Sequence, residues 1–142
     1  MCALQSNAGW INNEIEEAAK VMRFTTRVAP PNSLLFISDP DGGEAPEPIW
    51  GELILSTPSC ISVGCLMFLD GETEVTLGAA DEVNPGELPA FDAELETPNR
   101  AVAVWTVERE TVLSAAVTTP QTRVRIWVNH PTEPDRVVVG LG

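Results

Sequence analysis

Basic residues are missing from the middle of this chain. Residues 28–99 contain no Lys, Arg or His, although the chain holds eight Lys and Arg in all. The same interval carries fourteen of the 21 acidic residues, so most of the formal net charge of −13 lies there. Carboxylates at this density repel phosphate, which argues against nucleic acids and anionic membranes as partners and favours a basic protein partner. These acidic residues are Asp39, Asp41, Glu44, Glu47, Glu52, Asp70, Glu72, Glu74, Asp81, Glu82, Glu87, Asp92, Glu94 and Glu96.

Cysteine and long apolar runs are also scarce. The three cysteines, Cys2, Cys60 and Cys65, show no repeating spacing, which argues against a secreted disulfide framework. Cys60 and Cys65 lie in an apolar run, and we interpret them as buried thiols. No apolar run is long enough to cross a bilayer, and the N-terminus lacks the basic and apolar blocks of a secretory signal. We therefore predict a cytoplasmic protein.

Signatures of catalysis and of cofactor binding are missing as well. His130 is the only histidine, and it follows a predicted strand in Asn129-His130-Pro131, where a turn histidine bonded to its own backbone is the favoured interpretation. A thiol of Cys60 or Cys65 activated by His130 would need a cysteine outside the core. The sequence has no glycine-rich phosphate loop and no spaced Cys/His zinc motif. We predict a protein that is not an enzyme and has no cofactor.

Twelve prolines and ten glycines divide most of the chain into short segments, which is typical of an all-β domain. The segments are rich in β-branched residues and alternate between apolar and polar positions. Turn chemistry is good at Asp70-Gly71, Asn84-Pro85-Gly86 and Pro98-Asn99. The predicted strands are Arg23–Val28, Leu34–Ser38, Gly51–Ser56, Ile61–Leu69, Glu72–Leu77, Phe91–Glu94, Ala101–Val107, Val112–Val117, Thr122–Asn129 and Arg136–Leu141.

The predicted fold class is mainly β, as an antiparallel β-sandwich or small barrel with one short N-terminal helix. The helix is expected over Glu14–Lys20, where acidic residues fall in the first turn. Residues 1–142 are predicted to form a single domain, with 1–12 loosely ordered. Ile61–Leu69 is apolar almost throughout, so we expect it to be a central strand that is covered on both faces.

The acidic residues predict a partner-binding surface. A strand places alternate side chains on one face, so Glu72 should project with Glu74, and Asp92 with Glu94. Together with the loop that precedes Trp50, these carboxylates should form one broad negative surface that accelerates encounter with a basic partner. Trp50 would serve as an aromatic anchor. The predicted partner-binding residues are Asp39, Asp41, Glu44, Glu47, Trp50, Glu72, Glu74, Asp92 and Glu94.

Two other interpretations stay open. The acidity could serve solubility alone, in a structural or accessory β-domain that forms a homo-oligomer through an apolar sheet edge. The segment Asp39–Glu44 could instead bind calcium, because it offers three carboxylates around a flexible turn. It lacks the loop length and the flanking helices of an EF-hand, and Asp-Pro-Asp-Gly is also good turn chemistry.

One segment resembles a known family. Phe91–Val107 reads FDAELETPNRAVAVWTV, which contains a Phe-Asp pair, a Leu, a Pro, a short turn and an alternating strand that ends in Trp-Thr-Val. This stretch resembles part of the ComJ-like competence-nuclease inhibitors, which are small acidic bacterial proteins that bind and inhibit a DNA-degrading nuclease. The first sixty residues and the segment 122–131 show no counterpart. The resemblance implies a non-catalytic inhibitor or immunity-type protein that occludes a basic nuclease.

Overall fold

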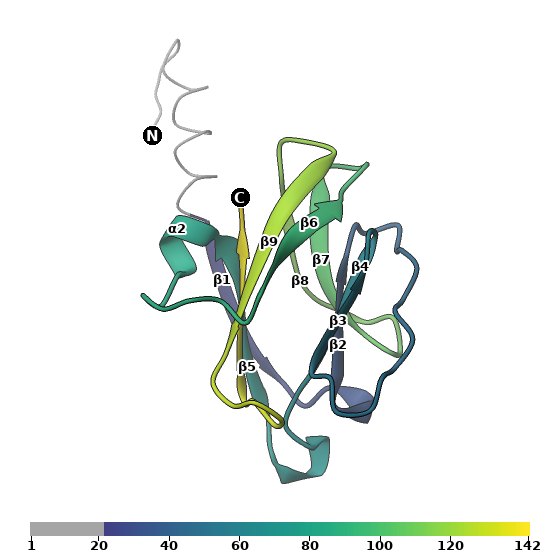
Figure 1. Ribbon diagram of the computed structural model, residues 1–142, viewed down its shortest axis with the longest axis vertical. Coiled ribbons are helices and arrows are strands. Elements are labelled where there is room, and N and C mark those ends of the chain that lie inside the picture. The colour runs from purple at the N-terminus through teal and green to yellow at the C-terminus, as the bar shows by residue number, and fades with distance from the viewer. Residues whose placement is uncertain (1–21) are drawn as a thin grey trace.

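The computed structural model describes residues 22–142 and arranges them as ten strands in two five-stranded sheets that pack face to face (Figure 1). Sheet I has the order β1-β5-β10-β9-β6, with β1 (Arg23–Val28), β5 (Thr73–Ala79), β10 (Arg136–Leu141), β9 (Gln121–Val128) and β6 (Phe91–Glu96). Sheet II has the order β3-β4-β2-β7-β8, with β3 (Ile54–Thr57), β4 (Cys60–Gly64), β2 (Leu34–Ser38), β7 (Ala101–Thr106) and β8 (Thr111–Ala116).

The predicted β-sandwich is confirmed, and each predicted strand corresponds to an observed one. The pairings are antiparallel except that β5 and β10 run parallel, with Val75 opposite Val137. A parallel pair needs a long connection. Here the connection contains β6 to β9 and therefore links both sheets. The expected helix at Glu14–Lys20 and the loosely ordered segment 1–12 lie outside the described residues.

Three predicted strands have the observed bounds, and seven differ, two of them by three residues or more at one end. Three short helical segments were not expected. β3 begins at Ile54 rather than at Gly51, because Gly51 adopts a φ of +88° in a turn. β4 ends at Gly64, and the chain then forms the 3-10 helix η2 (Phe68–Asp70). Leu69 is 76% exposed, so the prediction of a covered strand is wrong beyond Cys65. The other two segments are η1 (Pro31–Ser33) and α2 (Ala80–Val83).

The core lies between the sheets and follows the alternation of the strands. Sheet I contributes Val75, Leu77, Val124, Ile126, Val137 and Val139, and sheet II contributes Leu35, Ile37, Ile61, Val63, Val102 and Val104. Each of these side chains is at most 1% exposed. Full burial of such a side chain stabilises the fold by roughly 1.5–3 kcal/mol. The two sheets are therefore held together by aliphatic packing.

Charge is divided unequally between the sheets. No strand of sheet II contains an Asp, Glu, Lys or Arg, whereas all five strands of sheet I carry at least one. On the outer face of sheet II, Phe36 stacks on Trp105 at a centroid distance of 4.6 Å. The Trp105 indole Nε1 donates to Ser38 Oγ at 2.8 Å. None of the helices in the described part of the chain is long and apolar enough to cross a membrane.

Candidate partner-binding surface

The segment 39–53, which connects β2 to β3, is termed the acidic loop. It begins at Asp39, which is only 2% exposed although it was predicted to contact a partner. Asp39 Oδ1 accepts a hydrogen bond from Asn99 N at 2.8 Å, and Oδ2 accepts from Asn99 Nδ2 at 2.8 Å and from Asp41 N at 3.1 Å. Burial alone would raise the pKa of Asp39, but the hydrogen bonds from Asn99 and Asp41 outweigh it and lower the pKa.

Asp39 therefore fastens the acidic loop to the β6–β7 turn and is not part of the surface that a partner would meet. Asn99 Nδ2 also donates to Asp41 Oδ2 at 2.7 Å, so a single amide holds two carboxylates. Gly42 N donates to Asp39 O at 2.8 Å, which closes the turn with Gly42 at a φ of +91°.

The middle of the acidic loop is held against the β3–β4 turn. Glu44 N donates to Ser59 Oγ at 2.8 Å, and Thr57 Oγ1 donates to Glu44 O at 2.6 Å. The backbone passes so close that a Cβ on Gly43 would lie 2.1 Å from Ser59 O. These contacts engage only the loop backbone, and the Glu44 side chain is exposed. The acidic side chains are thus presented on a fixed path.

The far end of the acidic loop is a turn that displays Trp50. Glu52 N donates to Ile49 O at 3.1 Å, and Gly51 supplies the positive φ of +88° that the turn needs. Trp50 is fully exposed and Ile49 is 58% exposed. Exposure of the tryptophan ring to water is unfavourable, so its burial in a pocket of a partner would favour binding. Tryptophan is also frequent among the residues that dominate binding energy at interfaces.

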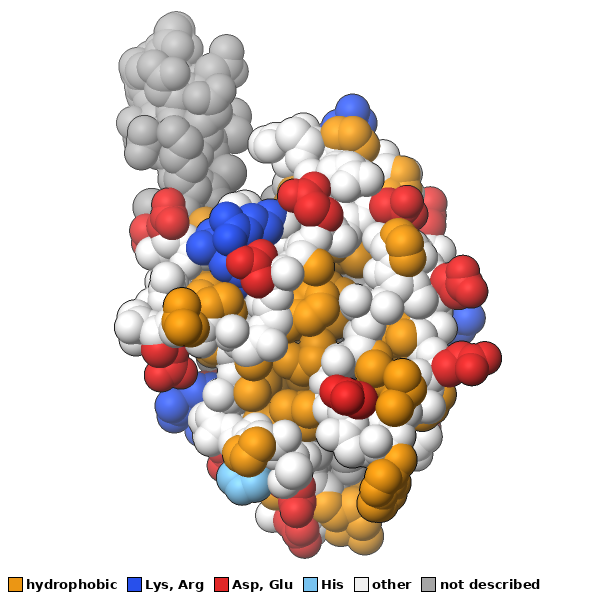
Figure 2. Space-filling model, viewed as in Figure 1, with side chains coloured by type: hydrophobic (Ala, Val, Ile, Leu, Met, Phe, Trp, Pro, Cys, Tyr) orange, Lys and Arg blue, Asp and Glu red, His pale blue; other side chains and the backbone are white. Residues whose placement is uncertain are grey.

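The acidic loop runs along the outer side of sheet II (Figure 1), and acidic side chains recur along that margin of the molecule (Figure 2). Asp41, Glu44, Glu47 and Glu52 are all exposed, and no basic residue occurs in the loop. The loop therefore brings four of the predicted residues together: Asp41, Glu44, Glu47 and Trp50.

The remaining predicted residues lie on or beside sheet I, where basic side chains intervene. The Glu74 carboxylate pairs with Arg136 Nε at 3.1 Å, and Arg27 lies opposite Glu74 on β1. Asp92 accepts two hydrogen bonds from Arg123, at 2.9 and 2.7 Å. These bonds hold the pKa of Asp92 below its usual value.

Glu94 lies directly opposite Arg123 in the β6–β9 register, and Arg125 lies opposite Asp92. Acidic and basic side chains accordingly meet on the sheet I side of the molecule (Figure 2). Glu72 is exposed and precedes β5. The expectation of one broad negative surface is wrong for sheet I, because β1, β9 and β10 place arginines from outside residues 28–99 in this sheet.

The thiols and the histidine are positioned as interpreted from the sequence. Cys60 and Cys65 are free and buried, and this burial raises their pKa values to about 11 and about 12. His130 Nδ1 accepts hydrogen bonds from Thr132 N at 3.1 Å and Glu133 N at 3.0 Å, so the histidine closes its own turn. Neither thiol is arranged as a nucleophile.

Within residues 22–142 there is no group of three or more His, Cys, Asp or Glu side chains that could hold a metal ion. In the segment proposed for calcium, the Asp39 oxygens face the Asn99 amide, which is a donor and not a metal ligand. The geometry of Asp39–Glu44 thus favours a turn over a cation site.

Two features of this surface were missed from the sequence. Asn99 was assigned only to a turn, and its role depends on a carboxylate sixty residues away in the chain. The exposed hydrophobic side chains Ile49, Met67, Phe68 and Leu69 were not singled out. Gly64 N donates to Leu53 O at 2.9 Å, so the segments that carry these side chains leave sheet II at the same end.

No protein-family model and no curated protein matches the chain. A solved structure does: the crystal structure of ComJ from Bacillus subtilis, described as an inhibitor of the DNA degrading activity of NucA. The two structures superpose with a TM-score of 0.58, over 83% of this chain and 93% of ComJ. This chain has the fold of ComJ. The resemblance first found at Phe91–Val107 is confirmed for the fold and extends across most of the chain, at 8% sequence identity.

Proposed function

We propose that this protein is a non-catalytic inhibitor that occludes a basic protein of the nuclease type. The observation that carries the proposal is the acidic loop, in which four exposed carboxylates and a fully exposed Trp50 occur without a single base. The fold adds support, because the solved protein that shares it is described as a nuclease inhibitor.

The proposed mechanism is competition for the nuclease groove. Nucleases offer Lys and Arg to the phosphates of their substrate, and a row of carboxylates can occupy the same positions. Long-range attraction accelerates encounter, while Trp50 supplies an apolar anchor. Because the loop backbone is already fixed by Asn99, Ser59 and Thr57, little conformational entropy is lost on binding.

The predicted residues take unequal roles in this mechanism. Asp41, Glu44, Glu47 and Trp50 make the direct contacts, and Asp39 positions the loop. Glu72, Glu74, Asp92 and Glu94 contribute less to attraction, because Glu74 and Asp92 pair with arginines of sheet I and Glu94 lies opposite Arg123. We place the protein in the cytoplasm, and the free thiols of Cys60 and Cys65 support a reducing compartment.

The experiment compares two variants of equal charge. In the loop variant, Glu44, Glu47 and Glu52 are changed to Gln. In the control variant, the exposed residues Glu82, Glu87 and Glu133 are changed to Gln. Each variant is titrated against NucA in a plasmid-degradation assay, and association rates are measured at low and high NaCl. A lysate of the source cells provides a second set of targets.

We expect the wild-type protein and the control variant to bind one basic protein and protect DNA, with affinity that falls as NaCl rises. The loop variant should associate more slowly and lose most of the salt dependence. Trp50→Ala should weaken binding about 30-fold through faster dissociation. An equal loss of nuclease affinity in both Glu→Gln variants would refute the proposal, and so would an affinity that is independent of salt.

A further inference from the structure

The connection between β4 and β5 displays three consecutive hydrophobic side chains to solvent. Met67, Phe68 and Leu69 are 43%, 38% and 76% exposed, and they lie on or beside the single turn of η2. A run of exposed apolar residues is unfavourable for a folded protein unless it serves a contact. These side chains are therefore a candidate docking surface.

Hydrogen bonds from two other segments hold η2 in place. Phe68 N donates to Ser33 Oγ at 3.1 Å, which ties η2 to η1. Leu66 N donates to Pro134 O at 2.8 Å, which ties the start of the connection to the β9–β10 turn. Because the backbone is already fixed, little conformational entropy is lost when a partner covers the side chains.

The tip of the acidic loop leaves sheet II at the same end as η2. Gly64 N donates to Leu53 O at 2.9 Å; Trp50 precedes this contact by three residues on one segment, and Met67 follows it by three on the other. Hydrophobic side chains gather at this end, the lower end of the view in Figure 2, beside acidic ones. We term this surface the apolar end, which consists of Ile49, Trp50, Met67, Phe68 and Leu69.

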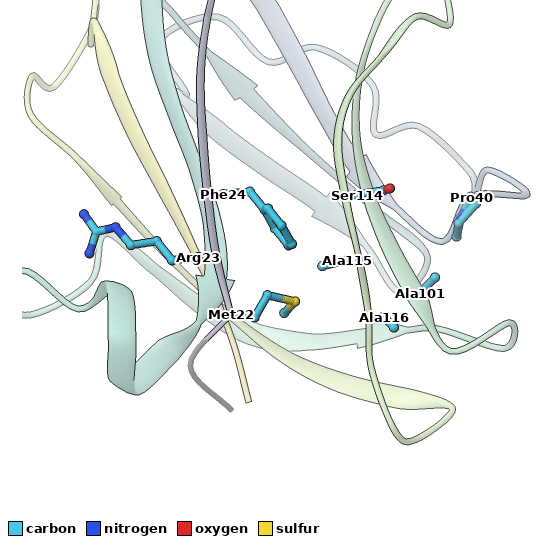
Figure 3. Close-up of a pocket in the computed structure, with 8 residues that line it drawn as sticks. All are labelled: Met22, Arg23, Phe24, Pro40, Ala101, Ser114, Ala115 and Ala116. Carbon is cyan, nitrogen blue, oxygen red and sulfur yellow. The ribbon is translucent and has the colours of Figure 1, made fainter. Parts of the chain in front are cut away.

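The apolar end lies away from the point where the chain enters the described residues. That point is Met22, which lines a cavity between β1 and β8 together with Phe24 and Ala115 (Figure 3). From there β1 runs to η1, and its six residues of strand cover about 20 Å. The exposed Phe24 borders the entry point, whereas η2 lies beside η1 at the other end of β1.

We infer that the apolar end enters an apolar hollow of the basic partner, and that Lys and Arg side chains border this hollow. The inference rests on the proposed function and identifies a second contact with the same partner. Exposed carboxylates flank both segments of the apolar end: Glu47, Glu52, Asp70 and Glu72. A partner that covers the apolar end therefore also meets these carboxylates.

Charge selects a basic occupant for the apolar end. Carboxylates that lose water in a contact cost free energy unless cations pair with them. An uncharged partner would supply no cations, and a second copy would bring its own carboxylates against them. Two arginines of sheet I are directed elsewhere, since Arg136 pairs with Glu74 and Arg27 lies opposite Glu74.

Hydroxyl-radical oxidation of the full chain, read by mass spectrometry, tests this surface without any substitution. The probe is NucA, or the basic nuclease recovered from the lysate where NucA does not bind. Met67, Phe68 and Leu69 should oxidise readily in the free protein, and the added nuclease should protect them together with Trp50. Leu88, which is 92% exposed in the segment after α2, should oxidise equally in both samples. Slow oxidation of Met67, Phe68 and Leu69 in the free protein would overturn the inference, because residues 1–21 or a second copy would then cover them.

Leu69→Gln and Leu88→Gln form a matched pair of variants, because each changes one exposed leucine and no charge. Leu69→Gln should weaken nuclease binding about tenfold through faster dissociation, with an unchanged dependence on salt. Leu88→Gln should bind like the wild type. Equal affinity of these two variants would overturn the inference but leave the proposed function standing, as long as the wild type binds and the loop variant associates more slowly. A wild-type protein that binds no basic nuclease would refute the proposed function and the inference with it.

Discussion

The hydrogen bonds between Asp39 and Asn99 are expected to stabilise the fold and to fix the position of the acidic loop. Asn99→Ala removes one of three donors to a carboxylate that is 2% exposed, and it also frees Asp41. A hydrogen bond to a charged group is worth roughly 1.5–3 kcal/mol. Because Asn99 itself is exposed, water can replace part of the loss, and we expect unfolding to become easier by about 2 kcal/mol.

The effect should depend on pH with a defined sign. The pKa of Asp39 is lowered in the folded state, so its contribution to stability is present above the ordinary value of 3.8. That contribution is lost as the pH falls through the lowered pKa. The difference between the wild type and Asn99→Ala should therefore be largest near neutral pH and should shrink below about pH 4.

Urea unfolding at several pH values measures this difference. A thermal scan should show a fall in Tm of about 6–10 °C, given a shift of roughly 3–5 °C per kcal/mol for a chain of this size. Asn84→Ala is the matched control, because Asn84 Oδ1 accepts only Gly86 N in an exposed turn. A loss below about 0.5 kcal/mol, or a loss that is the same at every pH, would refute the assigned role of Asn99.

Two further predictions concern the acidic loop and the core. Gly43→Ala should lower the free energy of unfolding by about 1–3 kcal/mol in urea and weaken nuclease binding, because the new Cβ would clash with Ser59 O. An unchanged affinity for the nuclease would contradict the fixed path of the loop backbone, and Ala45→Ser is the control. In a Cys2→Ser background, Cys60 and Cys65 should react with Ellman's reagent at pH 8 only as fast as the protein unfolds, because burial raises their pKa values to about 11 and about 12. Rapid labelling of the folded protein would show that the thiols are accessible.

The strands could be predicted because their signal is local. The alternation of Val124 and Ile126 against Arg123 and Arg125 marks β9 without knowledge of its neighbours. Burial of outward-facing residues could not be predicted in this way. Trp127 alternates with the arginines and yet is 3% exposed, because the segment after α2 crosses it and Glu87 O accepts its indole N–H at 2.9 Å.

The site was predicted in part for the same reason. The acidic loop was recognisable from its composition, but the burial of Asp39 depends on a turn sixty residues further along the chain. The pairing of Asp92 with Arg123 likewise depends on the β6–β9 register, which composition does not encode. The distribution of bases along the sequence therefore predicts the negative charge of the acidic loop correctly, but it predicts too negative a charge for sheet I.

The fold turns a charge imbalance in the sequence into a difference between two sides of one molecule. Arginines from β1, β9 and β10 lie among the acidic residues of sheet I, whereas sheet II has no charges in its strands and borders the acidic loop. A partner that approaches sheet II therefore meets a row of carboxylates beyond β2 with no base in the adjacent strands. Rising salt should weaken the attraction of the acidic loop to a basic partner. A NaCl titration of nuclease binding by the loop variant therefore tests this division, because binding through sheet I would leave the salt dependence of that variant unchanged.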